Sequence, residues 1–547
     1  MGIGHWDLFR LIRLIRIIRL IRLIFMDYKP TIGLEIHIEL NTMSKMFCAC
    51  PNESAAAEPN KNICPTCSGQ PGTLPAINSE AVKKIIKTGL ALHCQVARST
   101  FFERKNYFYP DLPKGYQISQ YQAPLSKNGY VDIRIPDKDG EVEKSEILNS
   151  KSETNLNGQN LKFKVKRIRI ERVHLEEDAG KLLHPEGTDY SLVDLNRAGI
   201  PLMELVTEPD IHSSGEAAEF VKELQLILRY LGVSGANMEK GEMRAEVNIS
   251  LAKDGEPLGT KVEVKNLNSI KAVEKSIEYE TKRQSEILNN AEKVIQETRG
   301  WDDKKETTFL QRNKESANDY RYFPEPDLPV LQFSQEFLDI VKNNIPELPE
   351  EKRQRFIREY HLTKKEIELY VHQRDLGSYF EKVVSELTNW VKEKYASGLS
   401  QEEFQKLIKL TSNYISTDLQ ALLNEKGIED FSEAKFKITP ENFAEFLCLL
   451  YLGEISSKIA KMLLPEMFLN GGDPSQIITD KGWQMVSDEA EIEKAAQEII
   501  TNNSKAVEDY KKGKSASLQF LIGQIMAKTK GKASPGLAKE ILEKMLK

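Results

Sequence analysis

The sequence predicts an α+β fold in which an N-terminal domain built on an antiparallel-rich sheet is followed by an all-helical part. Up to about residue 327, short runs that alternate apolar and polar residues, as half-buried strands do, stand between a few amphipathic helices. Beyond that point the strand-like runs vanish, and Lys, Glu, Leu and Gln dominate successive amphipathic stretches broken by Gly and Pro. We therefore expect the sheet, and any site built on it, to lie N-terminal to residue 327.

The bulk composition is that of a globular protein with several domains. The chain has 547 residues, of which 40% are hydrophobic and 29% charged, which leaves room for two to four domains. Its formal net charge of -6 argues against polyanion binding by the molecule as a whole, so a nucleic-acid surface must be local. The C-terminal end offers one, because ten lysines stand against four acidic residues from Lys505 onward.

Residues 1–25 form an atypical leader. Arginine recurs at every third position, at 10, 13, 16, 19 and 22, and this spacing moves it around a helix by about 60° per repeat. Neither a clean amphipathic face nor an apolar span results. We interpret the leader as untranslated or disordered, with Met26 as the natural start. The alternative is a helix on a membrane surface, to which Trp6 and Phe9 would contribute.

The first strand-like run, residues 31–40, places Glu35, His37 and Glu39 on one face because side chains alternate along a strand. A solvated face is the ordinary explanation of such a pattern. However, a second acidic cluster, His174 with residues 176–178, follows another strand-like run at 163–170. Carboxylates and an imidazole delivered from two strands make a hard-cation site, and Mg²⁺ with substrate phosphates suits it.

Four of the six cysteines predict a structural zinc site. Cys48 and Cys50 are followed, thirteen residues later, by the Cys64-Pro-Thr-Cys67 pair, and two such pairs can converge on one tetrahedral ion. With all four positions filled by protein, the ion has no place for substrate. The other two, Cys94 and Cys448, lie in apolar surroundings and are expected to be core thiols. Four clustered and two single cysteines do not look like a secreted disulfide framework, and no ordinary signal peptide precedes them. We therefore predict a reducing, cytoplasmic setting.

Phosphate binding would have to come from side chains. The sequence has neither a Gly-x-x-x-x-Gly-Lys-Ser/Thr loop nor a Gly-x-Gly-x-x-Gly after a strand. Arg104 and Lys105 are candidate phosphate ligands, and the aromatic residues that follow them can stack on a base or pack in the core. Residues 137–159 turn polar and indicate a long hairpin insertion without chemistry.

The clearest helix is predicted at residues 214–231. Its apolar residues follow a 3.6-residue period, a serine stands at its start, and Gly232 follows its end. Short runs at 131–135, 247–249 and 262–264 read as further strands. The helical part divides near residue 438, where Thr-Pro-Glu is a helix-start signal.

Seven stretches of the sequence, in this order, carry a resemblance to a known family: residues 32–40, 104–111, 117–120, 174–181, 191–197, 264–269 and 319–327. They resemble the B subunit of the glutamyl/aspartyl-tRNA amidotransferases (the GatB family), and the likeness runs from about Met26 to Lys547. The resemblance implies a catalytic cradle domain at 26–327 with a loop held by zinc, a helical domain at 328–437, and a YqeY-like tRNA-binding tail at 438–547.

The resemblance also implies a reaction. Members of this family use ATP and Mg²⁺ to phosphorylate the side-chain carboxylate of Glu-tRNA(Gln) or Asp-tRNA(Asn), and ammonia then displaces the phosphate. The expected partners are an amidase-type glutaminase (the A subunit), a small C subunit, and the tRNA, with no membrane involved. This chain shows no amidase signature of its own, so ammonia is expected from the glutaminase.

Carried over by position, Glu35, His37 and Glu177 would hold the catalytic Mg²⁺, with Glu176, Glu204 and Glu246 nearby. Arg104 and Lys105 would face phosphate or the tRNA acceptor end. The family's zinc site has four cysteines, and all four are present in this sequence. Three lysines of the tail would contact the tRNA body: Lys528, Lys530 and Lys532. The alternative, from another class, is a noncatalytic zinc-stabilised tRNA-binding protein whose acidic cluster is structural.

Overall fold

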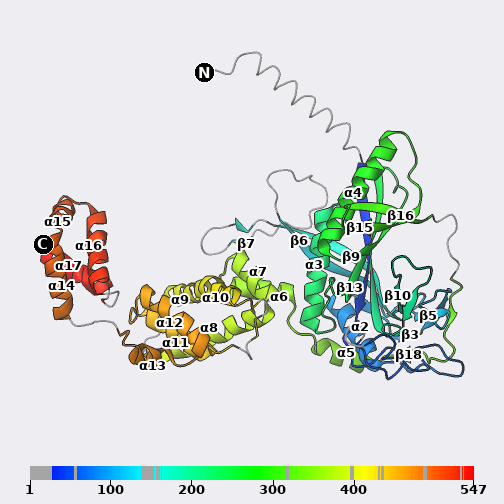
Figure 1. Ribbon diagram of the computed structural model, residues 1–547, viewed down its shortest axis with the longest axis horizontal. Coiled ribbons are helices and arrows are strands. Elements are labelled where there is room, and N and C mark those ends of the chain that lie inside the picture. The colour runs from blue at the N-terminus through cyan, green and yellow to red at the C-terminus, as the bar shows by residue number, and fades with distance from the viewer. Residues whose placement is uncertain are drawn as a thin grey trace, which may run out of the picture. The chain divides into compact units, whose positions relative to one another are not determined.

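The computed structural model describes residues 28–53, 58–136, 153–154, 160–161, 163–313, 320–394, 399–428, 431–432, 436–484, 489–529, 533 and 535–546. The leader at 1–25 and nearly all of the predicted hairpin at 137–159 lie outside these residues. Contacts divide the chain into two compact units, with the change at Pro349 and Glu350. The N-terminal unit is mixed α/β and the C-terminal unit is helical, which confirms the predicted fold class (Figure 1).

A nine-stranded sheet organises the N-terminal unit (Figure 1). All neighbouring strands pair antiparallel except β14 and β15, which are parallel. From one edge to the other the strands are β16 (Thr307–Asn313), β15 (Glu297–Asp302), β14 (Val262–Leu267), β13 (Met243–Lys253), β1 (Tyr28–Glu39), β12 (Pro201–Thr207), β9 (Phe163–Glu177), β6 (Ser126–Pro136) and β2 (Gln95–Val96).

Strand β1 is central because both of its edges are paired, with β12 on one side and β13 on the other. Its side chains alternate as predicted: Ile32, Leu34, Ile36 and Ile38 are fully buried in the core, and the residues between them are half-buried. The opposite face of β1 is therefore left for polar side chains.

Helices α2 (Ser79–Ala91), α3 (Ser214–Leu231) and α4 (Ile270–Asn289) cover the apolar face of the sheet, where α3 packs on β6 and α4 on β13. The bounds of α3 are those predicted. Ser213 caps its first turn by accepting the N–H of Glu216, and Gly232 ends it with a left-handed φ of 66°.

Small sheets and one more helix complete the unit. The three-stranded sheet β17-β4-β5 carries the residues around 104 to 119, and α5 (Gln335–Asn343) packs on α2. The remaining bounds are β4 (Glu103–Asn106), β5 (Tyr116–Ser119), β17 (Phe323–Pro324), β3 (Ser99–Thr100) with β18 (Leu331–Gln332), β10 (Lys181–Leu183) with β11 (Leu192–Asp194), and β7 (Glu153–Thr154) with β8 (Asn160–Leu161).

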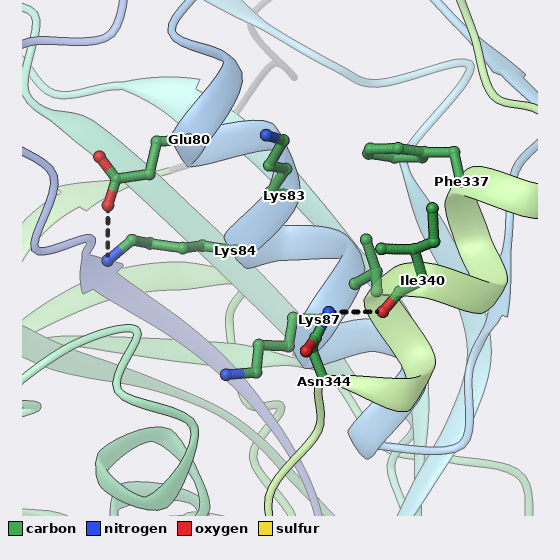
Figure 2. Close-up of a pocket in the computed structure, with 8 residues that line it drawn as sticks. Glu80, Lys83, Lys84, Lys87, Phe337, Ile340 and Asn344 are labelled. Atoms are coloured by element: carbon green, nitrogen blue, oxygen red, sulfur yellow. Dashed lines mark hydrogen bonds and ion pairs between the residues drawn. The ribbon is translucent and has the colours of Figure 1, made fainter.

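A groove of about 400 Å³ runs between α2 and α5. Figure 2 shows Phe337 and Ile340 of α5 on one side and the lysines of α2 on the other, where Lys84 pairs with Glu80 at 3.2 Å. Lys87 donates to the carbonyl of Leu231 at 2.8 Å. Lys84 and Lys87 therefore already have partners within the protein, and the groove shares no residue with the polar cleft considered below.

The C-terminal unit consists of helices, and α11 begins where the sequence predicts a helix start, with Thr439 as its cap and Pro440 in its first turn. The last four helices enclose a core of their own around Leu521 and Ile541. The helices are α6 (Pro349–Tyr360), α7 (Lys364–His372), α8 (Arg374–Lys394), α9 (Gln401–Asn413), the π-helix η1 (Tyr414–Leu419), α10 (Gln420–Glu425), α11 (Pro440–Tyr451), α12 (Ser457–Asn470), α13 (Pro474–Asp480), α14 (Glu489–Asn502), α15 (Ser504–Lys511), α16 (Ser515–Lys528) and α17 (Pro535–Leu546).

Acid is expected to weaken the C-terminal unit through Glu368 of α7. Burial disfavours its charge, but the hydrogen bond with His372 and the ion pair with Arg353 outweigh burial and lower the pKa of Glu368 from 4.5 to about 2. The resulting stabilisation is complete above about pH 4.5 and is lost as the pH falls towards 2. Because the side chain is 27% exposed, we expect Glu368→Gln to lower the free energy of unfolding by about 1–2 kcal/mol at pH 7.

Urea unfolding of both proteins at pH 7 and near pH 2, followed by circular dichroism, measures this difference. It should shrink towards zero at the lower pH. Glu402→Gln is the matched control, since Glu402 is 82% exposed in its pair with Lys406 and should change stability by less than about 0.5 kcal/mol. A Glu368→Gln difference that is the same at both pH values would contradict the assignment.

Candidate active site and zinc centre

A polar cleft of about 640 Å³ opens on the face of the sheet that the core leaves free. Strands β1, β9, β12, β13 and β14 contribute side chains to its floor, and β4, β5 and residues 320–322 contribute to its walls. Because the floor strands pair side by side, residues far apart in sequence meet here: His37 lies opposite Glu204, which lies opposite His174.

One group in the cleft combines an imidazole with two carboxylates. His37 Nε2 lies 3.6 Å from Glu204 and 3.7 Å from Glu176, and His174 Nε2 lies 3.3 Å from Glu204. His37, Glu176 and Glu204 can each offer one ligand atom within 4.8 Å of the others. This donor set fits a hard divalent cation such as Mg²⁺, with the remaining positions left to water or phosphate oxygens.

The charges of this group depend on one another. Burial and then the Glu204 charge raise the pKa of Glu176, whereas the two imidazoles lower the pKa of Glu204 against the effect of burial. Burial opposes protonation of His37, but Glu204 and Glu176 raise its pKa to about 9. The buried carboxylates thus require positive charge beside them, which either a protonated His37 or a bound cation can supply.

A second acidic group lies on the same face. Glu35 and Glu246 are directly opposite each other on β1 and β13, and Glu263 of β14 completes a set within 4.8 Å. Lys265 pairs with Glu246 at 2.8 Å and with Glu263 at 3.1 Å, and Asn248 donates to Glu35 at 2.7 Å. A lysine therefore already balances part of the negative charge of this group.

The structure places Glu177 apart from Glu35 and His37, so the predicted sharing of one cation by these three is corrected. The Glu177 carboxylate forms an ion pair with Lys114 and accepts the backbone N–H of Ile118 at 2.9 Å. Side chains alternate along β9, so Glu176 enters the cleft and Glu177 leaves it. Of these two neighbours, Glu176 is therefore the carboxylate that lines the cleft.

Arg104 and Lys105 also separate, because they are adjacent on β4 and point to opposite sides. Arg104 makes a bidentate pair with Glu325, at 2.7 and 2.8 Å, and its guanidinium lies 4.4 Å from the centre of the Tyr116 ring. Lys105 lines the cleft, where burial opposes its charge but Glu176 and Glu204 raise its pKa. Of these two residues, only Lys105 lines the cleft and can meet a ligand there.

Sequence reasoning missed several cleft residues. Arg172 lies two residues before His174 on β9, so its side chain leaves the same face of the strand as those of His174 and Glu176. Lys265 lies two residues after Glu263 on β14 and shares its face. The alternation of side chains along a strand could have identified both basic residues from the sequence. In the part of the chain that the structure describes, Arg172 Nε and His174 Nδ1 are buried without a hydrogen-bond partner. Such atoms are expected where a ligand or water completes the site.

Asp178 anchors two arginines at one side of the cleft. It lies 2.5 Å from Arg197 and 3.2 Å from Arg244, and Arg197 also pairs with Glu39 at 2.5 Å. Burial opposes ionisation, but these arginines lower the pKa of Asp178. The structure thus brings Glu39, Asp178 and the two arginines, which come from distant parts of the sequence, into one network.

The four cysteines of the predicted zinc site converge. The Sγ atom of Cys67 lies 3.8 Å from that of Cys64 and 4.0 Å from that of Cys50, and all four sulfurs lie within 4.8 Å of one another. A tetrahedral ion with Zn–S bonds of about 2.3 Å requires sulfurs about 3.8 Å apart, whereas a disulfide requires about 2.05 Å. The arrangement therefore fits zinc and not a disulfide.

A buried lysine supports this cluster. Lys45 is fully buried, with its Nζ 3.8 Å from Cys67 Sγ and 2.8 Å from the carbonyl of Ala198. The hydrogen bond from Cys48, with help from the Lys45 charge, lowers the pKa of Cys67 to about 4. Cys94 and Cys448 are buried and form no disulfide, as predicted for core thiols, and burial raises the pKa of Cys94 to about 12.

We expect Cys64→Ser to release bound zinc. A structural site that loses one thiolate loses most of its affinity, and the loop at 44–53 should then be cleaved faster by protease. Metal analysis of the purified protein measures the first effect and limited proteolysis the second. Cys94→Ala, which removes a thiol outside the cluster, should keep its zinc; full zinc content in Cys64→Ser would contradict the site.

Of the three lysines predicted to contact tRNA, the structure describes one. Lys528, at the end of α16, forms an ion pair with Glu498 of α14. Lys530 and Lys532 lie outside the described residues.

Comparison with models of known families shows to which class of protein this fold and cleft belong. Residues 30–339 match the model of the GatB/GatE catalytic domain, and residues 400–546 match that of the GatB domain. Among the described residues, no helix is both long and apolar enough to cross a bilayer.

Relatives that match nearly the whole chain identify the family. The chain is 44% identical to a protein of Persephonella marina over 95% of its own length and 100% of the relative's, and 45% identical to one of Thermotoga sp. over 95% and 99%. A Caldicellulosiruptor saccharolyticus protein is 44% identical over 95% and 99%. All three are named as the B subunit of aspartyl/glutamyl-tRNA(Asn/Gln) amidotransferase, and the chain belongs to that family. The noncatalytic alternative is not favoured, because the N-terminal match is to a catalytic domain.

Proposed function

We propose that the protein activates the side-chain carboxylate of Glu-tRNA(Gln), Asp-tRNA(Asn) or both with ATP and Mg²⁺, and forms the amide with ammonia. The relatives' name supplies the tRNA substrates and the reaction class. One observation carries the proposal: His37, Glu176 and Glu204 share a single cleft with Lys105. A site that must hold a cation and phosphate together needs this combination.

The chemistry explains why ATP is required. A carboxylate oxygen is a poor leaving group, so it first attacks the γ-phosphorus of ATP, and the bond from that phosphorus to ADP breaks. Ammonia then attacks the carbonyl carbon of the acyl phosphate, and the carbon–oxygen bond to phosphate breaks. The nitrogen loses one proton as the amide forms, and inorganic phosphate leaves with that proton. Both steps move negative charge between oxygens, which positioned cations stabilise.

We assign the following roles in these two reaction steps to residues of the cleft. His37, Glu176 and Glu204 would hold Mg²⁺. When bound, this cation would neutralise negative charge on the phosphate oxygens. His174 keeps Glu204 in place through its 3.3 Å contact, and Lys105 and Arg172 bind phosphate oxygens. Glu35, Glu246 and Glu263 form a second acidic group, in which Lys265 offsets charge.

The partners follow from the family. The expected complex contains an amidase-type glutaminase, which releases ammonia, and a small third protein, the C subunit. The expected cofactors are ATP, Mg²⁺ and a structural Zn²⁺. The lysines at 528, 530 and 532 would meet the tRNA backbone by charge rather than by base sequence. The cytoplasmic location stays a prediction from the cysteine usage of the sequence.

The test is ATP hydrolysis by the chain purified with its partner proteins. Turnover should require both Mg²⁺ and a mischarged tRNA, Glu-tRNA(Gln) or Asp-tRNA(Asn), and should stop when the metal is chelated. Tight tRNA binding without any turnover would instead favour a noncatalytic binding protein.

A further inference from the structure

Four tyrosines form one wall of the cleft, which we call the tyrosine wall: Tyr107, Tyr121, Tyr320 and Tyr322. Tyr121 and Tyr322 stack with ring centres 4.7 Å apart and an angle of 16° between planes. Tyr320 meets Tyr322 edge-on at 6.3 Å, and Tyr107 meets Tyr320 edge-on at 6.0 Å. The segments around residues 107, 121 and 320 thus build one continuous aromatic surface.

The wall is not part of the hydrophobic core. Its rings line a polar cleft, and Tyr121 keeps 57% of its surface exposed. The other three rings are half-buried. A stacked ring that stays exposed beside charged groups is typical of a binding surface, since burial in the core is otherwise the favourable outcome.

The wall lies next to the groups that would carry out phosphoryl transfer. Lys105 Nζ is 5.1 Å from the centre of the Tyr320 ring and 5.8 Å from that of Tyr107. Burial, and then the charges of Glu176 and Glu204, raise the pKa of Tyr322. A planar ring held against this wall is therefore close to both a phosphate-binding cation and the proposed metal ligands.

We propose that the tyrosine wall stacks the 3′-terminal adenine of the aminoacyl-tRNA. This assignment rests on the proposed function. Aromatic side chains stack on single-stranded bases, and the terminal nucleotides of tRNA are unpaired. The exposed edge at Tyr121 admits a chain end from solvent.

The adenine of ATP is the weaker candidate. Distance does not separate the two adenines, because a ribose and a chain of similar length stand between the base and the reacting atom in both molecules. The exposure of Tyr121 favours the tRNA end, because an unpaired chain end that enters from solvent meets this ring first.

The experiment compares two tRNAs on the assembled complex: intact tRNA(Gln), and the same tRNA without its terminal adenosine. With the wild-type complex, removal of that adenosine should weaken binding about tenfold, the effect of one stacked base. Tyr121→Ala and Tyr322→Ala should weaken binding of the intact tRNA by a similar factor. On these variants the truncated tRNA should bind no more weakly than the intact one, because the stacking partner is already gone.

Three controls make the result specific. Tyr121→Phe and Tyr322→Phe keep the ring and should keep the affinity, and ATP affinity should stay within about twofold in every variant. Tyr190→Ala removes a tyrosine outside the cleft with the same 57% exposure as Tyr121 and should change nothing.

Loss of ATP affinity in the alanine variants would reassign the wall to ATP and overturn the proposal. An unchanged tRNA affinity in the alanine variants would also overturn it. A loss of affinity on truncation of the tRNA that is as large in the variants as in the wild type would do the same. The truncation measured on the wild-type complex needs no variant to fold. Because all of these readouts are binding constants, they remain interpretable if ATP turnover, the test of the proposed function, is absent.

Discussion

Glu176→Gln in the assembled complex is expected to lower Mg²⁺-dependent ATP turnover about a thousandfold. Glutamine has nearly the same volume as glutamate, so the side chain stays in place, but a negative charge disappears from the group that His37 and Glu204 complete. Loss of a charged ligand at a site where charge develops in the transition state costs rate in this range. The measurement is the initial rate of ATP hydrolysis with mischarged tRNA, together with the Mg²⁺ concentration that gives half of the maximal rate, which should rise.

Glu177→Gln is the matched control, because it makes the same chemical change one residue along β9. Its carboxylate faces Lys114 and Ile118 N–H, so its replacement should leave the Mg²⁺ requirement within about twofold of wild type and lower the melting temperature. If Glu177→Gln raised the Mg²⁺ requirement and Glu176→Gln did not, the alternation inferred for β9 would be wrong, and the assignment made from the sequence would hold.

This pair of residues shows how far the sequence could lead. Alternation within residues 31–40 predicted correctly which side chains of β1 are buried, since a strand that passes through the middle of a sheet has one apolar face. The acids at 176–178 were recognised as a cluster, but consecutive carboxylates leave a strand on opposite faces. Which of them enters the cleft depends on how β9 pairs with β12 and on what covers its other side, and neither is visible in a single sequence.

The zinc cluster and helix α3 were easier to predict because their determinants are local. Cysteine pairs close in sequence, and a helix with a serine before its first turn and a glycine after its last, need no knowledge of distant segments. The second acidic group was missed as a unit, because Glu35, Glu246 and Glu263 come from three strands that only the sheet order brings together. Base stacking was considered for the aromatic residues that follow Lys105, which include Tyr107. That Tyr121, Tyr320 and Tyr322 join this ring was missed, because they come from other segments.

The second large effect distinguishes Lys105 from Arg104. Lys105→Met keeps most of the apolar stem but removes the charge that faces the cleft, so we expect ATP turnover to fall about a hundredfold or more with little change in melting temperature. The rate of ATP hydrolysis and a thermal unfolding curve, measured on the same preparation, separate the two quantities. Wild-type turnover in Lys105→Met would remove this lysine from the proposed mechanism.

Arg104→Met should show the opposite pattern, because the guanidinium acts on the fold rather than on the ligand. The side chain of Glu325 is fully buried, and removal of its bidentate partner would leave an unpaired charge in the interior. Breaking such a pair costs about 3–5 kcal/mol of stability, so the melting temperature should drop while the folded fraction keeps most of its turnover. We therefore expect separate roles for the two neighbours on β4, which follow from the side of the strand on which each lies. Arg104 fixes the segment that carries Tyr320 and Tyr322, and Lys105 lines the cleft, where it would meet phosphate.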